Sequence, residues 1–179
     1  MLLFDELNSY DIMLPDISNY KIIKEIGKGG SGTVYLAQNK RKEFVALKVL
    51  QYEKMVSKEK EAIATYIKTL KKIQHPNIVP INEVYDTKGL FYYEMPIADG
   101  ISKSDCTAAD WKPMTLEYLI RERAKSGTWF TVNKILNIFL PIISAVSAIW
   151  EQKLMHRDIK PDNILFINGK ACLGDMGLL

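Results

Sequence analysis

The chain has 179 residues, a formal net charge of +3 and 47% hydrophobic residues, a size and composition that suit one domain with a buried core. Its lysines are interspersed with glutamates, a pattern that argues against charge-driven nucleic-acid binding. The two cysteines, Cys106 and Cys172, lie far apart without metal-ligand spacing, which is typical of a reducing, cytoplasmic compartment.

Residues 1–19 precede the first strand-like run. They are acidic and lack a basic region before an apolar one, so they do not resemble a secretory signal. Their apolar residues suggest an arm that packs on the following lobe or on a partner, and a disordered tail is equally compatible with them. We therefore treat residues 1–19 as an N-terminal extension.

A glycine-rich turn between two strand-like runs is the first motif that points to chemistry. Gly27, Gly29, Gly32 and Val34 form GxGxxGxV after the run YKIIKEI. A Rossmann nucleotide site shares this spacing, but there a helix opens at the third glycine. The residues TVYLA that follow are β-branched and aromatic, which favours a strand. We predict a hairpin whose backbone N–H groups can approach phosphates.

The run FVALKVL predicts a third strand that carries Lys48. Ala46 lies two residues earlier and therefore on the same strand face. An exposed lysine on a strand is the alternative to a lysine that faces a binding site.

The sequence SKEKEAIATYIKTLKKI, residues 57–73, predicts a helix with one buried stripe. The stripe consists of Ile63, Ile67, Leu70 and Ile73. HPNIVPI then predicts a turn into a strand, in which His75 is a structural residue rather than a catalyst. LFYYEM predicts the next strand.

The segment 98–114 is polar and irregular, which indicates a linker or insertion. TLEYLIRERAKSG predicts a short helix. The apolar run VNKILNIFLPIISAVSAIWEQKL predicts a buried core helix, with a kink at Pro141. We expect no membrane span here, because the apolar run is short and Asn137, Pro141 and two serines interrupt it.

The run from His156 to Asn163, HRDIKPDN, is the most specific motif in the chain. Phosphoryl transfer needs a hydroxyl in line with the phosphate, a base near its proton and cations on the developing charge. Asp158 can accept or orient the hydroxyl proton, and Lys160 can reach the same phosphate. Asn163 and Asp175 offer oxygens that suit Mg²⁺. Each residue alone suits a solvated loop, but the ordered set indicates phosphoryl transfer.

With the glycine loop, Lys48, HRDIKPDN and the DMG tripeptide at Asp175, the chain from about Tyr20 to Leu179 resembles a Hanks-type serine/threonine protein kinase. Lys160 is typical of the serine/threonine branch, and the phrase LMHRDIKPDNILFINGKACLGDMGLL looks similar to bacterial members. The resemblance implies an α+β, protein kinase-like fold. Its small lobe would be a five-stranded antiparallel sheet with one helix (20–97), and its large lobe would be mainly helical and incomplete (98–179).

The resemblance also implies ATP and Mg²⁺ as cofactors, with Ala46 against the adenine and Lys48 on the α- and β-phosphates. The implied nucleotide-binding residues are Gly27, Lys28, Gly29, Gly30, Gly32, Val34, Ala46, Lys48, Met95, Ala98 and Asp175. The implied catalytic residues are Asp158, Lys160, Asn163, Lys48 and Glu61, and the implied metal ligands are Asn163 and Asp175.

The resemblance places Met95 near the gatekeeper position, with Pro96, Ile97 and Ala98 as the hinge. Pro96 has no N–H to donate, so the adenine would bond through neighbouring backbone, most simply at Ala98. A register two residues earlier, with Tyr93 as the gatekeeper, is the alternative.

The predicted helix departs from the family pattern. Active kinases pair the strand lysine with a helix glutamate about nine residues before the HPN turn, and Tyr66 stands at that position. Glu61 points about 140° away from Tyr66 on an ideal helix, and Glu59 lies on nearly the same face as Tyr66. We favour Glu61 as the partner of Lys48. Alternatively, both acids pair with nearby lysines in solvent.

Only two residues follow DMG, so we expect this polypeptide to lack the activation segment, the peptide platform and the later helices of a kinase. The apolar helix would then need cover from a partner chain, another copy or the N-terminal arm. A piece of a longer kinase, a gene product shortened by mutation and a natural half-kinase all remain open. Two functions also remain open. One is a Mg²⁺–ATP-dependent serine/threonine kinase that acts on a protein substrate, and the other is a nucleotide-binding regulatory module without activity alone.

Overall fold

The computed structural model describes residues 17, 19–51, 55–87, 90–102 and 105–175. Ile17 and Asn19 are therefore the described part of the predicted N-terminal extension. The rest of that extension, and the methionine and glycine of the DMG tripeptide, lie outside the described residues.

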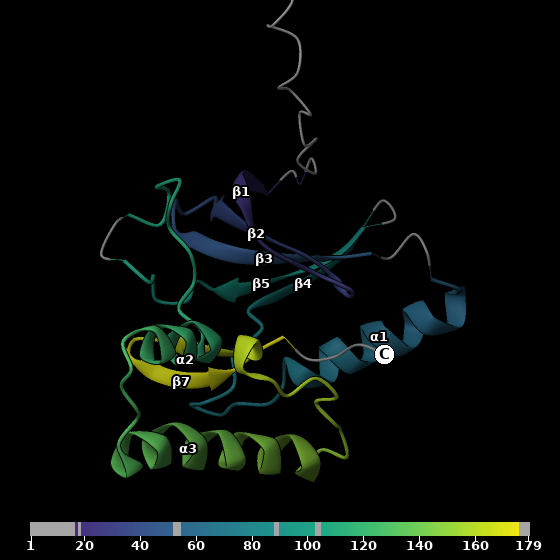
Figure 1. The fold of residues 1–179 in the computed structure, drawn as a ribbon. Coiled ribbons are helices and arrows are strands. Elements are labelled where there is room, and N and C mark those ends of the chain that lie inside the picture. Colours follow the sequence, from purple (N-terminus) through teal and green to yellow (C-terminus); the bar gives the residue numbers. More distant parts are fainter. Residues whose placement is uncertain (1–16, 18, 52–54, 88–89, 103–104, 176–179) are drawn as a thin grey trace, which may run out of the picture.

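A five-stranded antiparallel sheet forms the first lobe (Figure 1), and its strand order is β1-β2-β3-β5-β4. The strands are β1 (Tyr20–Gly29), β2 (Gly32–Asn39), β3 (Phe44–Leu50), β4 (Glu83–Thr87) and β5 (Leu90–Pro96). Gly29 pairs with Gly32, so the glycine-rich turn is a tight hairpin loop and no helix opens at the third glycine. The predicted small-lobe sheet is confirmed.

Helix α1 (Ser57–Leu70) follows β3 and buries Ile63, Ile67 and Leu70, as the spacing predicted. It ends three residues before the predicted boundary, and Ile73 is only partly buried. The Glu59 carboxylate accepts a hydrogen bond of 3.1 Å from the Val56 N–H, which satisfies one of the free donors at the start of the helix.

The described part of the second lobe consists of two α-helices, a 3₁₀ turn and a short hairpin, which lie below the sheet in Figure 1. Its elements are α2 (Leu116–Lys125), α3 (Val132–Glu151), the 3₁₀ turn η2 (Pro161–Asn163), β6 (Ile164–Ile167) and β7 (Lys170–Leu173). The backbone of Leu173 bonds to Asn77 and Val79, which joins β7 to the segment after α1. The imidazole of His75 accepts from the Asn77 N–H and bonds to Ser144 of α3, so His75 is the structural residue that we predicted.

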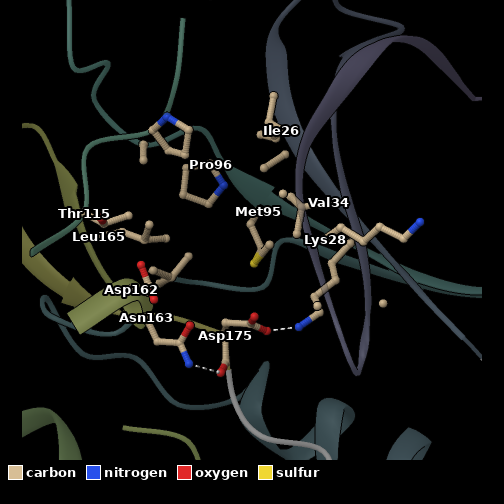
Figure 2. Close-up of a pocket in the computed structure, with 18 of the residues that line it drawn as sticks. Ile26, Lys28, Val34, Met95, Pro96, Thr115, Asp162, Asn163, Leu165 and Asp175 are labelled. Carbon is tan, nitrogen blue, oxygen red and sulfur yellow. Dashed lines mark hydrogen bonds and ion pairs between the residues drawn. The ribbon is translucent and has the colours of Figure 1, made fainter. Parts of the chain in front are cut away.

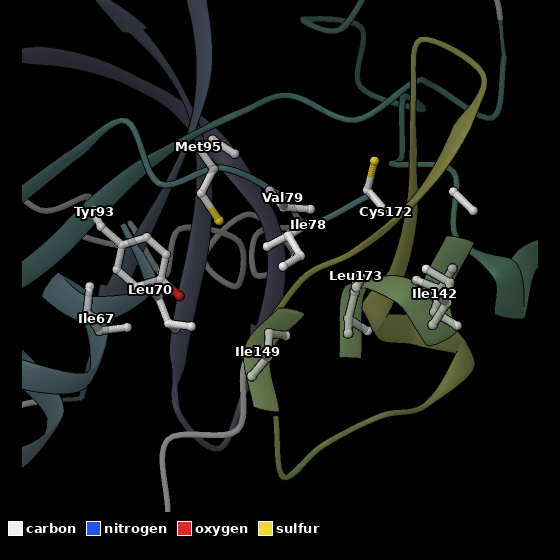
Figure 3. Close-up of a cluster of buried hydrophobic side chains, with 14 of the residues drawn as sticks. Ile67, Leu70, Ile78, Val79, Tyr93, Met95, Ile142, Ile149, Cys172 and Leu173 are labelled. Carbon is white, nitrogen blue, oxygen red and sulfur yellow. The ribbon is translucent and has the colours of Figure 1, made fainter. Parts of the chain in front are cut away.

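One hydrophobic core runs through both lobes (Figure 3). Ile67 and Leu70 from α1, Tyr93 from β5, Ile149 from α3 and Leu173 from β7 all belong to it. A second, smaller cluster lies on the opposite face of the sheet and includes Ile17 of the N-terminal extension, which is 4% exposed. The two lobes are therefore held together by shared packing as well as by the linker between them.

The polar segment that we predicted as a linker packs against the sheet. The Lys24 ammonium of β1 contacts the Ala108 carbonyl and lies 5.6 Å from the ring centroid of Trp111, which is buried. At the other end of the segment, Asp99 accepts hydrogen bonds from the N–H groups of Asn168 and Gly169 in the β6–β7 turn. This segment therefore connects β1 to the second lobe as well as linking the lobes in sequence.

Helix α3 buries only one stripe, formed by Ile138, Ile142, Ala145 and Ile149. Large apolar residues on its other faces are exposed, namely Val132, Ile135, Leu136, Phe139, Leu140, Ile143 and Trp150. The prediction of a core helix therefore holds for one stripe, and the helix continues without a break through Pro141.

Helix α3 is also the one helix of the described residues that is long and apolar enough to cross a membrane. Its mean hydropathy is 1.7, and 22% of its apolar stretch is buried. Our expectation that the run was too short was therefore wrong. Length and composition by themselves are weak support for a membrane span, because core helices of soluble proteins have the same properties.

Candidate active site

A pocket of about 450 Å³ lies between the sheet and the second lobe (Figure 2). Its upper wall and hinge side consist of Ile26, Gly27, Lys28, Gly29, Gly32, Val34, Ala46, Lys48, Met95, Pro96 and Ala98. Its lower wall consists of Val79, Pro113, Thr115, Lys160, Asp162, Asn163, Leu165 and Asp175. Residues from both ends of the described chain therefore meet in one cavity.

The inner part of this pocket is apolar. Val34 of β2 faces it from the sheet and Leu165 of β6 faces it from the second lobe (Figure 2). Ala46 of β3 also lines it. The small side chain of Ala46 leaves room between the two walls. An apolar slot bounded on both sides suits a flat aromatic ring such as a nucleobase.

The strand register places the hinge residues. Met95 pairs with Ala46 across the sheet, and Met95, Pro96 and Ala98 all line the pocket. Tyr93 pairs with Lys48 but lies outside the pocket lining, in the hydrophobic core (Figure 3). The choice between Met95 and Tyr93 as the gatekeeper therefore stays a prediction, as does the bond from the Ala98 N–H that would replace the one Pro96 lacks.

The glycine loop covers the outer end of the pocket. Gly27, Gly29 and Gly32 line it, as does Lys28. Gly30 does not line the pocket: it is exposed in the turn at the tip of the hairpin. The role of Gly30 at the nucleotide therefore stays a prediction.

The glycines of this loop should respond differently to substitution. At Gly32, φ is +155° and an added Cβ would collide with the backbone carbonyl oxygen of Val49, so Gly32→Ala should lower the free energy of unfolding by roughly 1–3 kcal/mol. A Cβ at Gly29 would meet no atom within 4 Å, so Gly29→Ala should keep its stability. If the loop holds the phosphates of a nucleotide, Gly29→Ala should nevertheless weaken ATP binding several-fold, because Gly29 lines the pocket and the added methyl group would occupy part of it.

Thermal unfolding and ATP titration of the two variants, side by side, test this difference. A Gly32→Ala protein as stable as the wild type would show that the close approach to Val49 is not needed.

Lys48 is the most deeply buried charge of the site, with 1% of its side chain exposed. Its ammonium forms an ion pair with the Asp175 carboxylate (Figure 2), and neither of the two paired atoms has a hydrogen-bond partner among the described residues. Burial lowers the pKa of Lys48 to about 8, the Asp158 carboxylate acts in the opposite direction and Lys160 lowers it further. Lys48 is thus an inward-facing cation rather than an exposed strand lysine.

Helix α1 supplies no acid to Lys48. Glu61 is exposed, and the Glu59 carboxylate bonds to the start of its own helix. At the position that carries the glutamate in the family pattern, the Tyr66 hydroxyl donates to the carbonyl oxygen of Met155 at 2.7 Å. The predicted pair between Lys48 and Glu61 is therefore wrong, because the helix turns Glu61 toward solvent.

Asp158 lies at the centre of the loop between α3 and β6. Its carboxylate accepts hydrogen bonds from the Lys160 ammonium at 2.7 Å and from the Asn163 amide at 2.8 Å. The hydrogen bond from Lys160, and then that from Asn163, hold the pKa of Asp158 below its usual range, while its slight burial acts in the opposite direction. Asp158 is therefore ionised at neutral pH and can accept a proton.

His156 links this loop to the chain just before Asp175. Its Nδ1 accepts from the Asp158 N–H at 3.3 Å, so Nε2 carries the proton and donates to the Gly174 carbonyl at 2.9 Å. Burial lowers the pKa of His156 and favours this neutral form. Arg157 and Asp175 adopt positive φ values of 64° and 45°, a conformation that costs free energy and is frequent at functional sites.

Asn163 and Asp175 meet at the floor of the pocket (Figure 2). The Asn163 carbonyl accepts from the Gly174 N–H at 2.8 Å, and its amide nitrogen donates to Asp158 and to the Asp175 carbonyl. Its amide oxygen forms no hydrogen bond with the described residues. No group of three acidic, histidine or cysteine ligands occurs in the described part of the chain. Mg²⁺ fits this pair, since it is commonly held by one or two protein oxygens together with phosphates and water.

The structure thus brings Lys48, Lys160, Asn163 and Asp175 to one end of the pocket, places Asp158 beside it in contact with Lys160 and Asn163, and leaves Glu61 and Gly30 outside the lining. Sequence reasoning missed several lining residues, namely Ile26, Val79, Pro113, Thr115, Asp162 and Leu165. Leu165 could have been found, because it lies in the short apolar strand directly after the catalytic loop. Pro113 and Thr115 carry no sequence signal that sets them apart from other linker residues.

A family model described as the protein kinase domain matches residues 20–179. The chain belongs to the protein kinase family. This kinase chain is 33% identical over 165 residues to the human serine/threonine-protein kinase Nek5, with 90% of this chain and 21% of the relative covered. It is 34% identical over 154 residues to the serine/threonine-protein kinase PknD of Chlamydia abortus (83% and 16% covered). It is 30% identical over 181 residues to samkB of Dictyostelium discoideum, a probable serine/threonine-protein kinase (97% and 28% covered).

These relatives confirm the likeness to serine/threonine kinases that the sequence predicted. A bacterial and a human kinase match at nearly the same identity, so the narrower bacterial placement stays a prediction. The chain spans between 16% and 28% of the length of these three relatives.

Proposed function

We propose that this kinase chain binds Mg²⁺–ATP in the pocket and carries the groups that transfer the γ-phosphoryl to a serine or threonine hydroxyl of a protein. The observation that carries the proposal is the convergence of a buried cation, an ionised carboxylate and two metal-suited oxygens at one end of an apolar slot. Phosphoryl transfer depends mainly on positioning and electrostatic stabilisation, and these groups supply both.

Each residue has a defined task in this proposal. The slot between Ala46, Val34 and Leu165 takes the adenine, and the Ala98 backbone bonds to its edge. Lys48 and the backbone of the glycine loop hold the phosphates.

At the reacting end, Asp158 accepts the proton of the attacking hydroxyl, and Lys160 lies beside it to neutralise charge on the transferring phosphate. Asn163 and Asp175 would hold Mg²⁺, which supplies positive charge to the phosphate oxygens.

The direct test pairs a binding measurement with a transfer measurement on the wild-type chain. ATP should raise the Tm in the presence of Mg²⁺ and less so with EDTA, and labelled phosphate from γ-labelled ATP should appear on a generic protein or peptide substrate. Absence of an ATP-dependent shift would contradict the nucleotide site itself.

A second candidate function is a nucleotide-binding regulatory module without phosphoryl transfer. The observation that favours it is that helix α1 supplies no glutamate to Lys48, since Glu61 is exposed and Tyr66 bonds elsewhere. Mg²⁺-dependent binding of ATP without detectable transfer would support this alternative for the chain.

The proposed role of Lys48 predicts a pH dependence of ATP affinity. The protonated ammonium holds the phosphates, and the pKa of Lys48 in the free protein is about 8. ATP affinity should therefore be full below about pH 7 and should fall as the pH rises through 8, by at most about tenfold per pH unit.

Titrations of ATP and adenosine between pH 6.5 and about 9.5 test this prediction, since adenosine carries no phosphate and should bind independently of Lys48 ionisation. A Lys48→Met variant should bind ATP weakly at every pH. A wild-type ATP affinity that stays flat to pH 9.5 would show that Lys48 does not bind phosphate as a titrating cation.

A further inference from the structure

We propose that Tyr66 is a positioning residue that ties helix α1 to the catalytic loop, in place of an ion pair between the helix and Lys48. This inference rests on the proposed function, because it concerns the alignment of the same site. In the family pattern, an acid of the helix pairs directly with the strand lysine. Here the contacts lead from α1 to the backbone of the loop, and from there to Asp175 and Lys48.

The contact is specific and long-range. The Tyr66 hydroxyl donates to the carbonyl oxygen of Met155 at 2.7 Å, across 89 positions of sequence. Burial raises the pKa of Tyr66, with Arg157 acting in the opposite direction, so the hydroxyl stays protonated and remains a donor at neutral pH. The ring itself is half-buried beside the core residues of α1 and β5.

Met155 lies directly before His156, so the contact reaches the backbone at the residue that precedes the HRDIKPDN run. His156 bonds through one ring nitrogen to the Asp158 N–H and through the other to the Gly174 carbonyl. Gly174 precedes Asp175, which forms the ion pair with Lys48. A continuous series of contacts therefore leads from Tyr66 to the buried lysine.

Neither Glu59 nor Glu61 of α1 pairs with Lys48. Glu61 is exposed, and Glu59 bonds to the Val56 N–H at the start of the helix. The Lys48 ammonium has the Asp175 carboxylate as its ion-pair partner. The Tyr66 hydroxyl is thus a direct polar contact between α1 and the backbone next to the reacting groups.

The test removes only that hydroxyl. Loss of one hydrogen bond to the loop backbone should lower kcat of Tyr66→Phe by about five- to tenfold and leave the KM for ATP within about twofold. Backbone amides of residues 155–158 should exchange with deuterium faster in Tyr66→Phe than in the wild type. A merely structural role would lower the Tm and speed exchange throughout the molecule without this local effect.

Two matched variants serve as controls. Tyr35→Phe removes a hydroxyl that forms no hydrogen bond with the described residues. Glu61→Gln removes the acid that we first expected to pair with Lys48. Both variants should keep the wild-type kcat and the wild-type deuterium exchange at residues 155–158. Wild-type kcat together with wild-type exchange in Tyr66→Phe would overturn the proposal. If the wild-type chain transfers no phosphate, the proposed activity fails, and the exchange at residues 155–158 still decides whether Tyr66 positions the loop.

Discussion

Replacement of Asp158 by asparagine should lower kcat for phosphoryl transfer by about 10²–10⁴-fold, with little change in the affinity for Mg²⁺–ATP. The ionised carboxylate accepts hydrogen bonds from Lys160 and Asn163, and the pKa lowered mainly by Lys160 keeps it ready to accept a proton. An asparagine has nearly the same shape but cannot take the proton of the attacking hydroxyl. Asp158 does not line the nucleotide pocket itself, so ATP binding should survive.

Single-turnover transfer assays and calorimetric titration of Mg²⁺–ATP measure the two effects separately. Asp86→Asn is the matched control, because it removes the same charge from an exposed position on β4. An Asp158→Asn variant that transfers phosphate at the wild-type rate would exclude Asp158 as the base.

Replacement of Asp175 by asparagine should abolish the Mg²⁺ dependence of ATP binding and lower kcat by a factor of about 10³ or more. Asp175 is the only carboxylate among the residues that we expect to hold the metal, and it is also the ion-pair partner of Lys48. Its loss removes the ion-pair partner of the buried Lys48 ammonium. The free energy of unfolding should therefore fall by roughly 1–3 kcal/mol, which Asp158→Asn should not show.

Titrations of ATP with Mg²⁺ and with EDTA provide the measurement. The wild type should bind more tightly with Mg²⁺, whereas Asp175→Asn should bind equally with and without it. A variant that keeps the full Mg²⁺ enhancement would show that other groups hold the metal.

Much of the first lobe could be predicted because its signals are local. The glycines between two runs with strand propensity indicated a hairpin, and the alternation along β3 placed Ala46 and Lys48 on one face. The catalytic loop could be predicted for the same reason, since Asp158, Lys160 and Asn163 lie within a few residues and contact one another directly.

Helix α1 shows what the local sequence pattern could not predict. Its buried stripe followed from the spacing of isoleucine and leucine, but the partner of Lys48 did not, because it depends on how the helix is rotated relative to β3. The same chemistry of an acid near a lysine was available at Glu59, Glu61 and Asp175. Only the arrangement of distant segments selected Asp175.

The sequence by itself determined the order of the elements and the set of polar groups available for phosphoryl transfer, because hairpin turns, strand alternation and the catalytic loop are encoded over short distances. The tertiary structure decided which charges pair, which hinge residues line the pocket and which stripe of α3 is buried. These outcomes depend on contacts between residues far apart in the chain, whose free energies arise only when the two lobes pack together.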